Sequence, residues 1–319
     1  MLFNKLGKTK IEVSSIIIGT WQAGRQMWAG IDDKETTTAI RKAVDLGINT
    51  IDTAEVYGNG YSEQIVAKAT NPIREKVVYA TKVFCSHLKH DQVIKACHRS
   101  LRNLKTDYID LYQIHWPQGS FGFKKVPVEE TFSALNLLKE QGKIRAIGVS
   151  NFSLDEIKEA LKYGEIESLQ PPYSLFFRYI EKEIMPFCLK NNITILGYSS
   201  LAQGFLTGKF KLDHKFDKKD HRSGSKLFQN KNYKNIIDAV SKLKPIADKN
   251  NVSMSQLALA WVISHKNTCA IAGARNKSQV EENIKAVEIS IEKESLKLAD
   301  EICKKAAGFL DDDPVIWKH

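Results

Sequence analysis

The sequence predicts an α/β fold, a parallel (β/α)8 TIM barrel with an N-terminal β-hairpin plug and extra C-terminal helices. Short apolar segments alternate with segments of helical periodicity eight times along the chain, which is typical of a parallel barrel. The length of 319 residues is ordinary for one such barrel with insertions, and no linker-like composition divides it. No early strand is followed by the G-x-G-x-x-G turn of a dinucleotide-binding doubly wound sheet. We therefore expect one barrel domain over residues 1–319.

The first expected element is a hairpin over residues 2–14, where apolar and polar residues alternate around a G-K-T-K turn. In a barrel this hairpin would plug one end. The barrel strands are short apolar runs that end in turn or polar residues. They are expected at residues 16–18, 48–51, 77–80, 109–114, 145–149, 168–170, 193–197 and 269–272.

Helices are predicted where apolar residues recur at helical spacing between a capping residue and a stop signal. Two of them are expected to be capped, one by Ser62 or an adjacent residue and one by Ser153, and Gly47 and Gly164 are expected to end two. The helices are expected at residues 34–46, 62–69, 91–104, 128–139, 153–163, 181–190, 231–249, 253–264, 278–286 and 294–305. Residues 201–230 have little periodicity and are expected to form a long loop, a kind of segment that is usually functional or mobile.

The composition indicates a globular chain, with 43% hydrophobic and 26% charged residues. The net charge is +10, but Lys and Arg are dispersed and form no basic run interleaved with aromatic residues, so we expect no nucleic-acid partner. No segment has the length of a membrane span or the apolar core of a signal peptide, so we expect no membrane partner. The five cysteines are widely spaced without C-x-x-C, which favours reduced thiols, no metal site and a cytoplasmic protein.

Polar side chains follow the ends of three early strands. Asp52 ends the second barrel strand, and Tyr57 lies five residues later, before a G-N-G turn. Lys82 follows the third strand and His115 the fourth. Because the carboxyl ends of parallel strands meet at one end of a barrel, we expect these four side chains to lie together. An Asp–Lys pair alone is as well explained by a core salt bridge, but beside a Tyr and a His it forms an acid–base set.

Reduction of a carbonyl by hydride transfer requires a proton donor at the carbonyl oxygen. A tyrosine, with an ordinary pKa of about 10, is a reluctant donor at neutral pH. A nearby cation favours the phenolate, so we expect Lys82 to lower the pKa of Tyr57, with Asp52 orienting Lys82. His115 can hydrogen-bond the carbonyl or share the proton.

Four motifs, in this order, make the chain resemble the aldo-keto reductase superfamily. They are D-T-A-E-V-Y-G at residues 52–58, A-T-K at 80–82, D-L-Y-Q-I-H-W-P at 110–117 and I-G-V-S-N-F at 147–152. The resemblance runs from K-L-G-K at residues 5–8 to Q-V-E-E-N at 279–283, nearly the whole chain. It implies an NADPH-dependent oxidoreductase that reduces aldehyde carbonyls to alcohols, with ketones and sugars as further candidate substrates.

The resemblance also implies roles for individual residues. The catalytic set would be Asp52, Tyr57, Lys82 and His115, with Tyr57 as the general acid. The substrate contacts would be Trp21, Tyr57, His115 and Trp116. Trp28, Phe121 and Phe123 lie near these strand ends in the sequence and either enclose a small carbonyl substrate or pack on the barrel.

The cofactor implied by the resemblance is NADP(H). Polar residues at the ends of the fifth and sixth strands would hold the nicotinamide carboxamide, Tyr198 would stack on the ring, and Arg275 would bind the 2′-phosphate. On their own, Gln170 is equally a satisfied buried amide and Tyr198 a core aromatic. The expected cofactor-binding residues are Gly19, Thr20, Trp21, Asp52, Ser150, Asn151, Gln170, Tyr198, Ser199, Leu201, Gly204, Leu206, Lys209, Gly273, Ala274, Arg275, Gln279, Glu282 and Asn283.

Three positions depart from the family pattern. Ser200 and Ala272 stand where proline is frequent, and Gly273 stands where some members carry a phosphate-binding lysine. The expected preference for NADP over NAD therefore depends on Arg275 and Lys209.

A second interpretation is a cofactor-binding regulatory subunit, since the same superfamily includes the β subunits of voltage-gated potassium channels. No segment precedes the predicted hairpin in this sequence, so we expect the enzyme. A nucleic-acid-binding barrel would depend on net charge alone. The expected partner is a small-molecule carbonyl substrate, and no pattern in the sequence predicts an oligomeric state.

Overall fold

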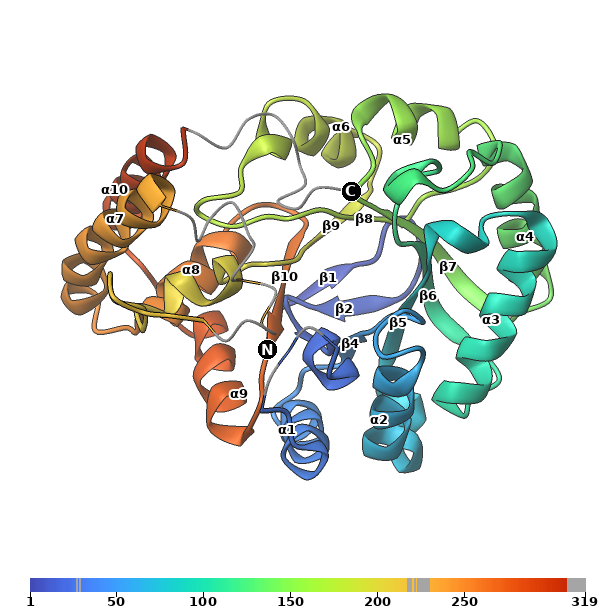
Figure 1. Cartoon of the computed structure of the whole chain (residues 1–319), viewed down its shortest axis with the longest axis horizontal. Coiled ribbons are helices and arrows are strands. Elements are labelled where there is room, and N and C mark those ends of the chain that lie inside the picture. The colour runs from blue at the N-terminus through green and yellow to red at the C-terminus, as the bar shows by residue number, and fades with distance from the viewer. Residues whose placement is uncertain (27, 29, 217–219, 221, 223–229, 309–319) are drawn as a thin grey trace.

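Eight parallel strands form a closed barrel in this computed structural model, which describes residues 1–26, 28, 30–216, 220, 222 and 230–308 (Figure 1). The order around the barrel is β10-β3-β4-β5-β6-β7-β8-β9, so consecutive strands are neighbours and the last strand closes on the first. The strands are β3 (Ile16–Gly19), β4 (Thr50–Asp52), β5 (Val78–Val83), β6 (Ile109–Ile114), β7 (Ile144–Ser150), β8 (Ser168–Gln170), β9 (Thr194–Gly197) and β10 (Thr268–Gly273). The predicted (β/α)8 barrel is confirmed.

Helices surround the barrel and cover the outward faces of its strands (Figure 1). Ser153 caps α5 as expected, because its side chain and that of Glu156 form a reciprocal capping box. The helices are α1 (Asp33–Asp45), α2 (Tyr61–Thr70), α3 (His90–Leu104), α4 (Val128–Glu140), α5 (Leu154–Ala160), α6 (Ile184–Lys190), α7 (Asn230–Lys249), α8 (Met254–Ile263), α9 (Lys277–Ile284) and α10 (Lys293–Ala306).

The barrel strands alternate their side chains between two apolar layers, as strands buried on both faces must. In β3, Ile17 belongs to the interior cluster, whereas Ile16 and Ile18 belong to the larger cluster between strands and helices. The interior cluster consists of Leu6, Ile11, Val13, Ile17, Val78, Ala80, Leu111, Ala146, Leu196, Cys269 and Ile271.

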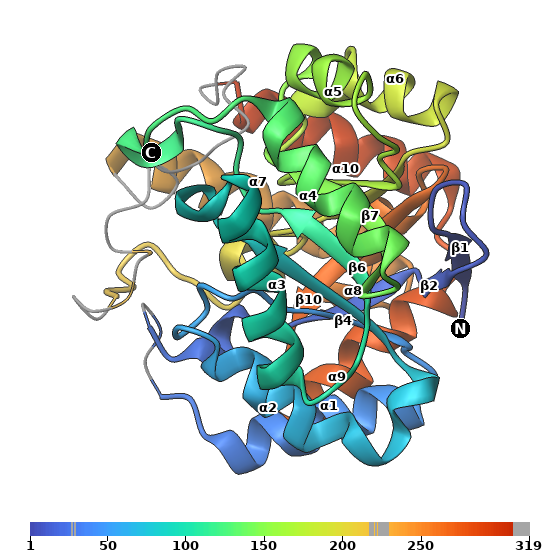
Figure 2. The same ribbon diagram turned by 90° about the vertical axis from the view of Figure 1, so that its right-hand side faces the viewer.

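A hairpin of β1 (Phe3–Lys5) and β2 (Glu12–Ser14) plugs one end of the barrel, as predicted (Figure 2). Gly7 in its turn has a φ of +56° and donates its N–H to Thr194 Oγ1 at 2.9 Å. A Cβ at Gly7 would lie 2.6 Å from the Cα of Glu167, so only glycine allows this close approach. The carboxyl ends of the barrel strands, where this fold carries its chemistry, lie at the other end.

Strand β5 is longer than predicted. The sequence placed its end at Ala80, but parallel pairing with β6 continues through Lys82 opposite Gln113 and Val83 opposite Ile114. Lys82 therefore lies within a strand and points into the barrel, where its side chain is 0% exposed.

Two helix starts also differ from prediction. Gly60, in a left-handed conformation, and not Ser62, precedes α2. The Ser62 hydroxyl instead donates to Thr20 O at 2.8 Å and accepts from Thr53, which joins α2 to the ends of β3 and β4. Helix α6 begins at Ile184, because residues 179–181 form a separate 3-10 turn.

The predicted C-terminal helices are present, and α7 and α10 lie side by side at one edge of the barrel (Figure 1). Arg178, before α6, joins this layer to the barrel. Its guanidinium forms ion pairs with Glu181 at 2.7 Å and with Asp300 in α10, and it lies over the Trp261 ring of α8 at 4.9 Å. Tyr173 also donates to Glu181, at 3.0 Å.

Replacing Arg178 by Ala is expected to lower the free energy of unfolding by about 1–3 kcal/mol, because two half-buried carboxylates lose their cation. Urea denaturation followed by tryptophan fluorescence measures this change. The control is Lys158→Ala, whose partner Asp155 is almost fully exposed, and it should change stability by less than about 0.5 kcal/mol. Equal effects would show that Arg178 does not anchor α10.

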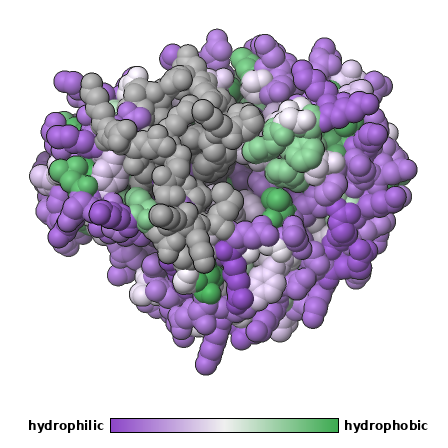
Figure 3. All heavy atoms as spheres, viewed as in Figure 1, coloured by the Kyte–Doolittle hydropathy of each residue, from purple (hydrophilic) through white to green (hydrophobic). Residues whose placement is uncertain are grey.

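The face of the molecule in Figure 3 is mainly hydrophilic, with apolar residues gathered in small patches. Within the described ranges, no helix combines the length and the apolar character that crossing a bilayer requires.

Candidate active site

Asp52 and Lys82 form a buried ion pair at the carboxyl end of the barrel. Lys82 Nζ donates to Asp52 Oδ1 and to Thr53 O, at 2.7 Å in each case. The second carboxylate oxygen, Asp52 Oδ2, accepts from Gln170 Nε2 at 2.7 Å and from Gln113 Nε2 at 3.5 Å. Both oxygens are therefore satisfied, which is the condition for holding a charge pair in this dry interior.

Tyr57 lies on the loop between β4 and α2, with its ring centroid 5.1 Å from Lys82 Nζ. Burial, and then the negative charge of Asp52, raise the pKa of Tyr57 well above its ordinary value. This corrects the expected direction, because Asp52 compensates the charge of Lys82 and desolvation dominates. Burial also lowers the pKa of Lys82, against the opposing effect of Asp52. Tyr57 thus keeps its proton at neutral pH, the form that a general acid requires.

His115 lies directly beyond β6, with its ring 5.6 Å from the Tyr57 ring in an edge-on arrangement. Burial, and then the charge of Lys82, lower the pKa of His115 well below its ordinary value, so the imidazole is neutral. Its Nδ1 is buried and has no hydrogen-bond partner among the described residues. Such an unsatisfied polar atom in a native structure calls for an explanation, and a bound ligand would supply one.

The backbone that carries Tyr57 is packed against the turn after β3. Trp21 begins the 3-10 turn η1 (Trp21–Gly24), and its ring lies 6.3 Å from Tyr57 and 5.2 Å from Trp28. A Cβ at Gly24 would lie 2.7 Å from the carbonyl carbon of Tyr57, and one at Gly58 would lie 2.5 Å from Gly24 O. Two glycines therefore allow η1 to approach the Tyr57 loop backbone to backbone.

The aromatic residues after β6 divide into packed and exposed members. Trp116 is buried, and its ring stacks on the His115 ring with 6.5 Å between centroids, so it packs against the imidazole. Phe121 and Phe123 are 38% and 43% exposed, and their rings lie 5.6 and 6.1 Å from Phe84. Phe84 in turn lies 5.8 Å from His115. An apolar wall thus extends outward from the acid–base group.

The three residues expected to hold the nicotinamide carboxamide, together with Tyr198, which was expected to stack on the ring, form one connected group. Ser150 Oγ donates to Gln170 O at 2.7 Å, and Tyr198 OH donates to Asn151 Oδ1 at 2.8 Å. Asn151 Nδ2 donates to His115 O at 3.0 Å, which connects this group to the acid–base residues. Gln170 Nε2 donates to Asp52 Oδ2, so the same group is also connected to the Asp52–Lys82 pair.

Three cations gather where the loop after β9 meets the start of α9. Arg222 and Arg275 lie 5.2 and 5.7 Å from the ring of Trp28. Arg222 forms a two-pronged ion pair with Asp220, at 2.8 and 2.5 Å. Burial and then the charge of Arg222 lower the pKa of Arg275, and burial and then both arginines lower that of Lys209. Asp220 offsets only part of this repulsion at Arg275 and Lys209, so a bound anion would relieve the rest.

Most other predicted cofactor residues also lie at the carboxyl ends of strands. Gly19 and Gly273 pair in register between β3 and β10, and Thr20 Oγ1 donates to Asp52 O at 2.8 Å. Gln279 Oε1 accepts from Arg275 N at 2.8 Å. Ser199, Leu201, Gly204, Ala274 and Glu282 are half-buried in or next to these loops.

Two predicted cofactor residues have side chains that are buried within the protein. Leu206, in η6 (Ala202–Thr207), is fully buried. Asn283 is buried, and its Nδ2 donates to Gly273 O at 3.5 Å, so it holds the loop after β10 in place.

This geometry agrees with a family match. The model of the Aldo/keto reductase family matches residues 15–304. The chain belongs to the aldo/keto reductase family. The resemblance inferred from the four motifs is confirmed.

Several relatives of this family member share most of its length. It is 39% identical over 293 residues to aldo-keto reductase YhdN of Bacillus subtilis (strain 168), covering 88% of this chain and 87% of YhdN. It is 35% identical over 308 residues to the NADH-specific methylglyoxal reductase of Escherichia coli (strain K12), covering 90% and 93% of the two chains. A probable voltage-gated potassium channel subunit beta of Arabidopsis thaliana is 33% identical over 319 residues, covering 91% of this chain and 92% of that one.

Solved structures of aldo/keto reductases share the fold. The glycerol dehydrogenase AKR11B4 from Gluconobacter oxydans superposes with a TM-score of 0.86 at 35% identity, covering 95% of each chain. An aldo-keto reductase from Klebsiella pneumoniae in complex with NADPH superposes with a TM-score of 0.77 at 30% identity, also covering 95% of each chain.

Sequence reasoning missed several residues of the site in this family member. Gln22 lines a small hollow with Gly19, Thr20 and Arg275, and its Oε1 is buried without a hydrogen-bond partner in the described part of the chain. Arg222 lies in the long loop after β9, which was expected to be functional or mobile. No pattern in the sequence indicates which Lys or Arg of that loop contacts Trp28. All five cysteines are free and buried, and the described residues hold no cluster suited to a metal ion.

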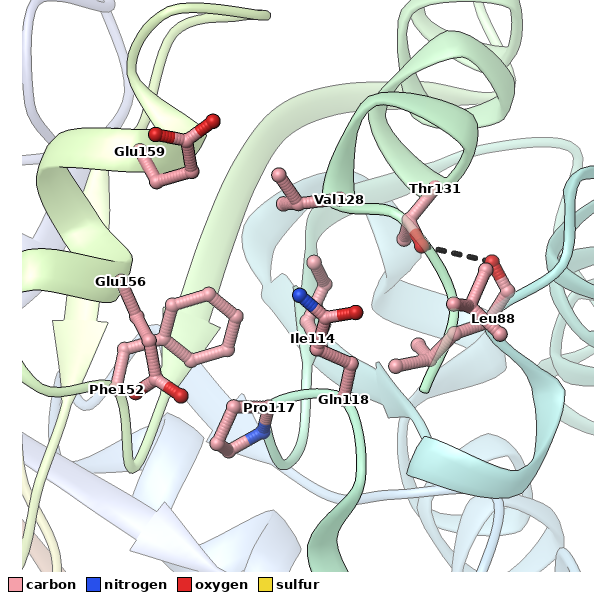
Figure 4. Close-up of a pocket in the computed structure, with 10 residues that line it drawn as sticks. Leu88, Ile114, Pro117, Gln118, Val128, Thr131, Phe152, Glu156 and Glu159 are labelled. Carbon is pink, nitrogen blue, oxygen red and sulfur yellow. Dashed lines mark hydrogen bonds between the residues drawn. The ribbon is translucent and has the colours of Figure 1, made fainter. Parts of the chain in front are cut away.

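A separate hollow lies between α4 and α5 (Figure 4). Pro117 and Gln118 line it from the loop after β6, and Phe152 lines it from the start of α5 (Figure 4). Glu156 at its rim is occupied by the capping box of α5. Because none of the four acid–base residues lines this hollow, it is not part of the candidate active site.

Proposed function

We propose that this aldo/keto reductase family member is an NADPH-dependent oxidoreductase that reduces aldehyde carbonyls, with ketones and sugars as further substrates, to alcohols. The observation that carries the proposal is the convergence of Tyr57, His115 and the Asp52–Lys82 pair beside an apolar wall. A protonated phenol and a neutral imidazole are both able to hydrogen-bond a carbonyl oxygen. The apolar surroundings strengthen such hydrogen bonds.

The residues of the site fit a phosphorylated nicotinamide cofactor. Arg275 and Lys209 form a cationic group that would hold phosphate. Gln22 Oε1, an unsatisfied acceptor that lines the same hollow as Arg275, would accept from a hydroxyl or amino group of the cofactor. Ser150, Asn151 and Gln170 would hold the carboxamide, and Tyr198 would stack on the nicotinamide ring. When bound, the reduced nicotinamide would supply a hydride to the carbonyl carbon.

The side chains of the protein would supply the proton that the carbonyl oxygen needs. Tyr57 would donate its hydroxyl proton to the carbonyl oxygen as charge develops there. Lys82, 5.1 Å from the Tyr57 ring, would stabilise the phenolate left behind, and Asp52 fixes Lys82 through a 2.7 Å hydrogen bond. Neutral His115 would orient the carbonyl oxygen. Phe84, Phe121 and Phe123 would cover the substrate and reduce its exposure to water.

A panel of carbonyl compounds tests the proposed activity. Purified protein is mixed with NADPH or NADH and with methylglyoxal, glyceraldehyde, benzaldehyde or a simple ketone, and the loss of reduced-nicotinamide absorbance is followed. Turnover of at least one aldehyde with NADPH is expected. Tight cofactor binding without turnover of any carbonyl would favour the alternative, a regulatory subunit like the potassium-channel relative.

Arg275 is expected to select NADPH over NADH. A guanidinium binds phosphate through two charge-assisted hydrogen bonds, each contributing about 1.5–3 kcal/mol. NADPH is therefore expected to bind at least about tenfold more tightly than NADH, a difference of only about 1.4 kcal/mol. Arg275→Ala should weaken NADPH binding and leave NADH binding nearly unchanged.

Fluorescence quenching by each cofactor measures both affinities. The matched control is Lys266→Ala, which removes an exposed cation at the opposite end of β10 and should change neither affinity. The E. coli relative is named as NADH-specific, so a preference for NADH is the outcome against which this prediction is tested. Equal binding of NADH and NADPH by the wild type, or equal weakening of both by Arg275→Ala, would contradict the 2′-phosphate role.

A further inference from the structure

Glu55 is a buried carboxylate that the proposed mechanism does not use. It lies three residues after Asp52 and two residues before Tyr57, on the same loop. Its side chain is 8% exposed, and both of its oxygens are occupied. Oε1 accepts from Phe84 N at 2.9 Å and lies 2.8 Å from His87 Nδ1, while Oε2 accepts from Arg99 at 2.9 Å.

These contacts connect two neighbouring strand ends. Phe84 is the second residue after Lys82, so the side chain of Glu55 reaches from the Tyr57 loop to the end of β5. The backbone makes the same connection more weakly, since Glu55 N donates to Lys82 O at 3.3 Å. Glu55 thereby joins the segment that carries the proton donor to the segment that carries its cation.

The partners of Glu55 differ in exposure. Phe84 N is a backbone donor whose position depends on β5, whereas the side chains of His87 and Arg99 are 39% and 41% exposed. A partly exposed side chain contributes little through such a contact, because water screens and competes with it. The hydrogen bond to Phe84 N is therefore the contact through which Glu55 can position the site.

We propose that Glu55 is a positioning residue, whose carboxylate length and hydrogen bond to Phe84 N set the place of Tyr57 relative to Lys82. This inference rests on the proposed function of Tyr57 and Lys82. Displacement of a reacting group by about 1 Å can cost up to about a hundredfold in rate. Loss of the connection should therefore lower kcat, with little effect on the separate cofactor residues.

The test separates the reach of the side chain from its charge. Glu55→Asp keeps the charge but is shorter by one methylene, whereas Glu55→Gln keeps the length and the Oε1 acceptor but loses the charge. We expect Glu55→Asp and Glu55→Ala to lower kcat by at least about tenfold, and Glu55→Gln to stay within about threefold of the wild type. The dissociation constant for NADPH should stay within about twofold in all three variants.

Glu167 supplies a matched control at the plugged end of the barrel. It is also buried, accepts a backbone hydrogen bond from Ile147 N at 2.8 Å, and pairs with half-exposed Lys139 at 2.9 Å. Glu167→Asp and Glu167→Ala should lose stability, as the Glu55 variants do, but keep kcat per cofactor-binding site. Titration with NADPH counts the folded sites, so misfolding lowers the number of sites and not kcat per site.

The outcomes are distinct. Normal kcat in Glu55→Asp, a kcat of Glu55→Gln as low as that of Glu55→Asp, or equal losses in the Glu167 series would each overturn the positioning role. The Asp and Gln variants decide the question even if Glu55→Ala does not fold. If the wild type shows no turnover that depends on Tyr57, the proposed function itself fails, and this result is separate from the comparison of Glu55 variants.

Discussion

Replacing Tyr57 by Phe is expected to lower kcat for aldehyde reduction by about a hundredfold or more, because it removes the general acid. The variant loses one hydroxyl and almost no volume, and no protein hydrogen bond of that hydroxyl holds the fold in the described residues. NADPH affinity and thermal stability should therefore match the wild type. Steady-state kinetics with the best aldehyde, together with fluorescence titration of NADPH, measure these quantities.

The pH dependence of the wild type gives a second measurement of the same role. Burial raises the pKa of Tyr57 above 10.0, so the hydroxyl keeps its proton as the pH rises through neutrality. Loss of kcat through ionisation of Tyr57 is thus expected only above about pH 10. Burial lowers the pKa of His115 below 6.5, so protonation of His115 should affect kcat only in acid.

The control for Tyr57→Phe is Tyr163→Phe, which removes the hydroxyl of a half-buried tyrosine that donates to Glu159 in α5 and contacts none of the four acid–base residues. Its kcat should equal that of the wild type. Near-wild-type turnover by Tyr57→Phe would show that Tyr57 is not the proton donor.

Replacing Lys82 by Met is expected to reduce turnover as severely as the loss of Tyr57, and also to destabilise the fold. Turnover falls because the phenolate of Tyr57 loses the cation 5.1 Å away. Stability falls because Asp52 loses its 2.7 Å ion pair and is left as a buried charge, with an expected loss of about 3–5 kcal/mol. Gln170 still donates to Asp52 Oδ2 at 2.7 Å, so the smaller end of this range is favoured.

A double variant separates the two effects of Lys82→Met. Asp52→Asn combined with Lys82→Met removes both charges, and should recover most of the lost stability but none of the lost turnover. Lys139→Met is the control for losing a lysine paired with a buried carboxylate, and it should keep kcat because it lies at the plugged end. If Lys82→Met reduces aldehydes normally across neutral pH, Lys82 has only a structural role.

Much of the fold and part of the site follow from local patterns in the sequence. Apolar runs and helical periodicity depend on residues close together in the chain, and they located every barrel strand, although β5 extends past its expected end to include Lys82. The rule that carboxyl ends of parallel strands meet at one end also predicted that Asp52, Tyr57, Lys82 and His115 lie together.

The tertiary structure decided how each group is used, because burial and long-range contacts depend on which surfaces meet. The raised pKa of Tyr57 follows from desolvation and from the ion pair of Lys82 with Asp52, and neither is visible in a motif. The same reason explains the burial of the Leu206 and Asn283 side chains. It also applies to Glu55, because the motif that contains Glu55 does not predict its 2.9 Å hydrogen bond to Phe84 N.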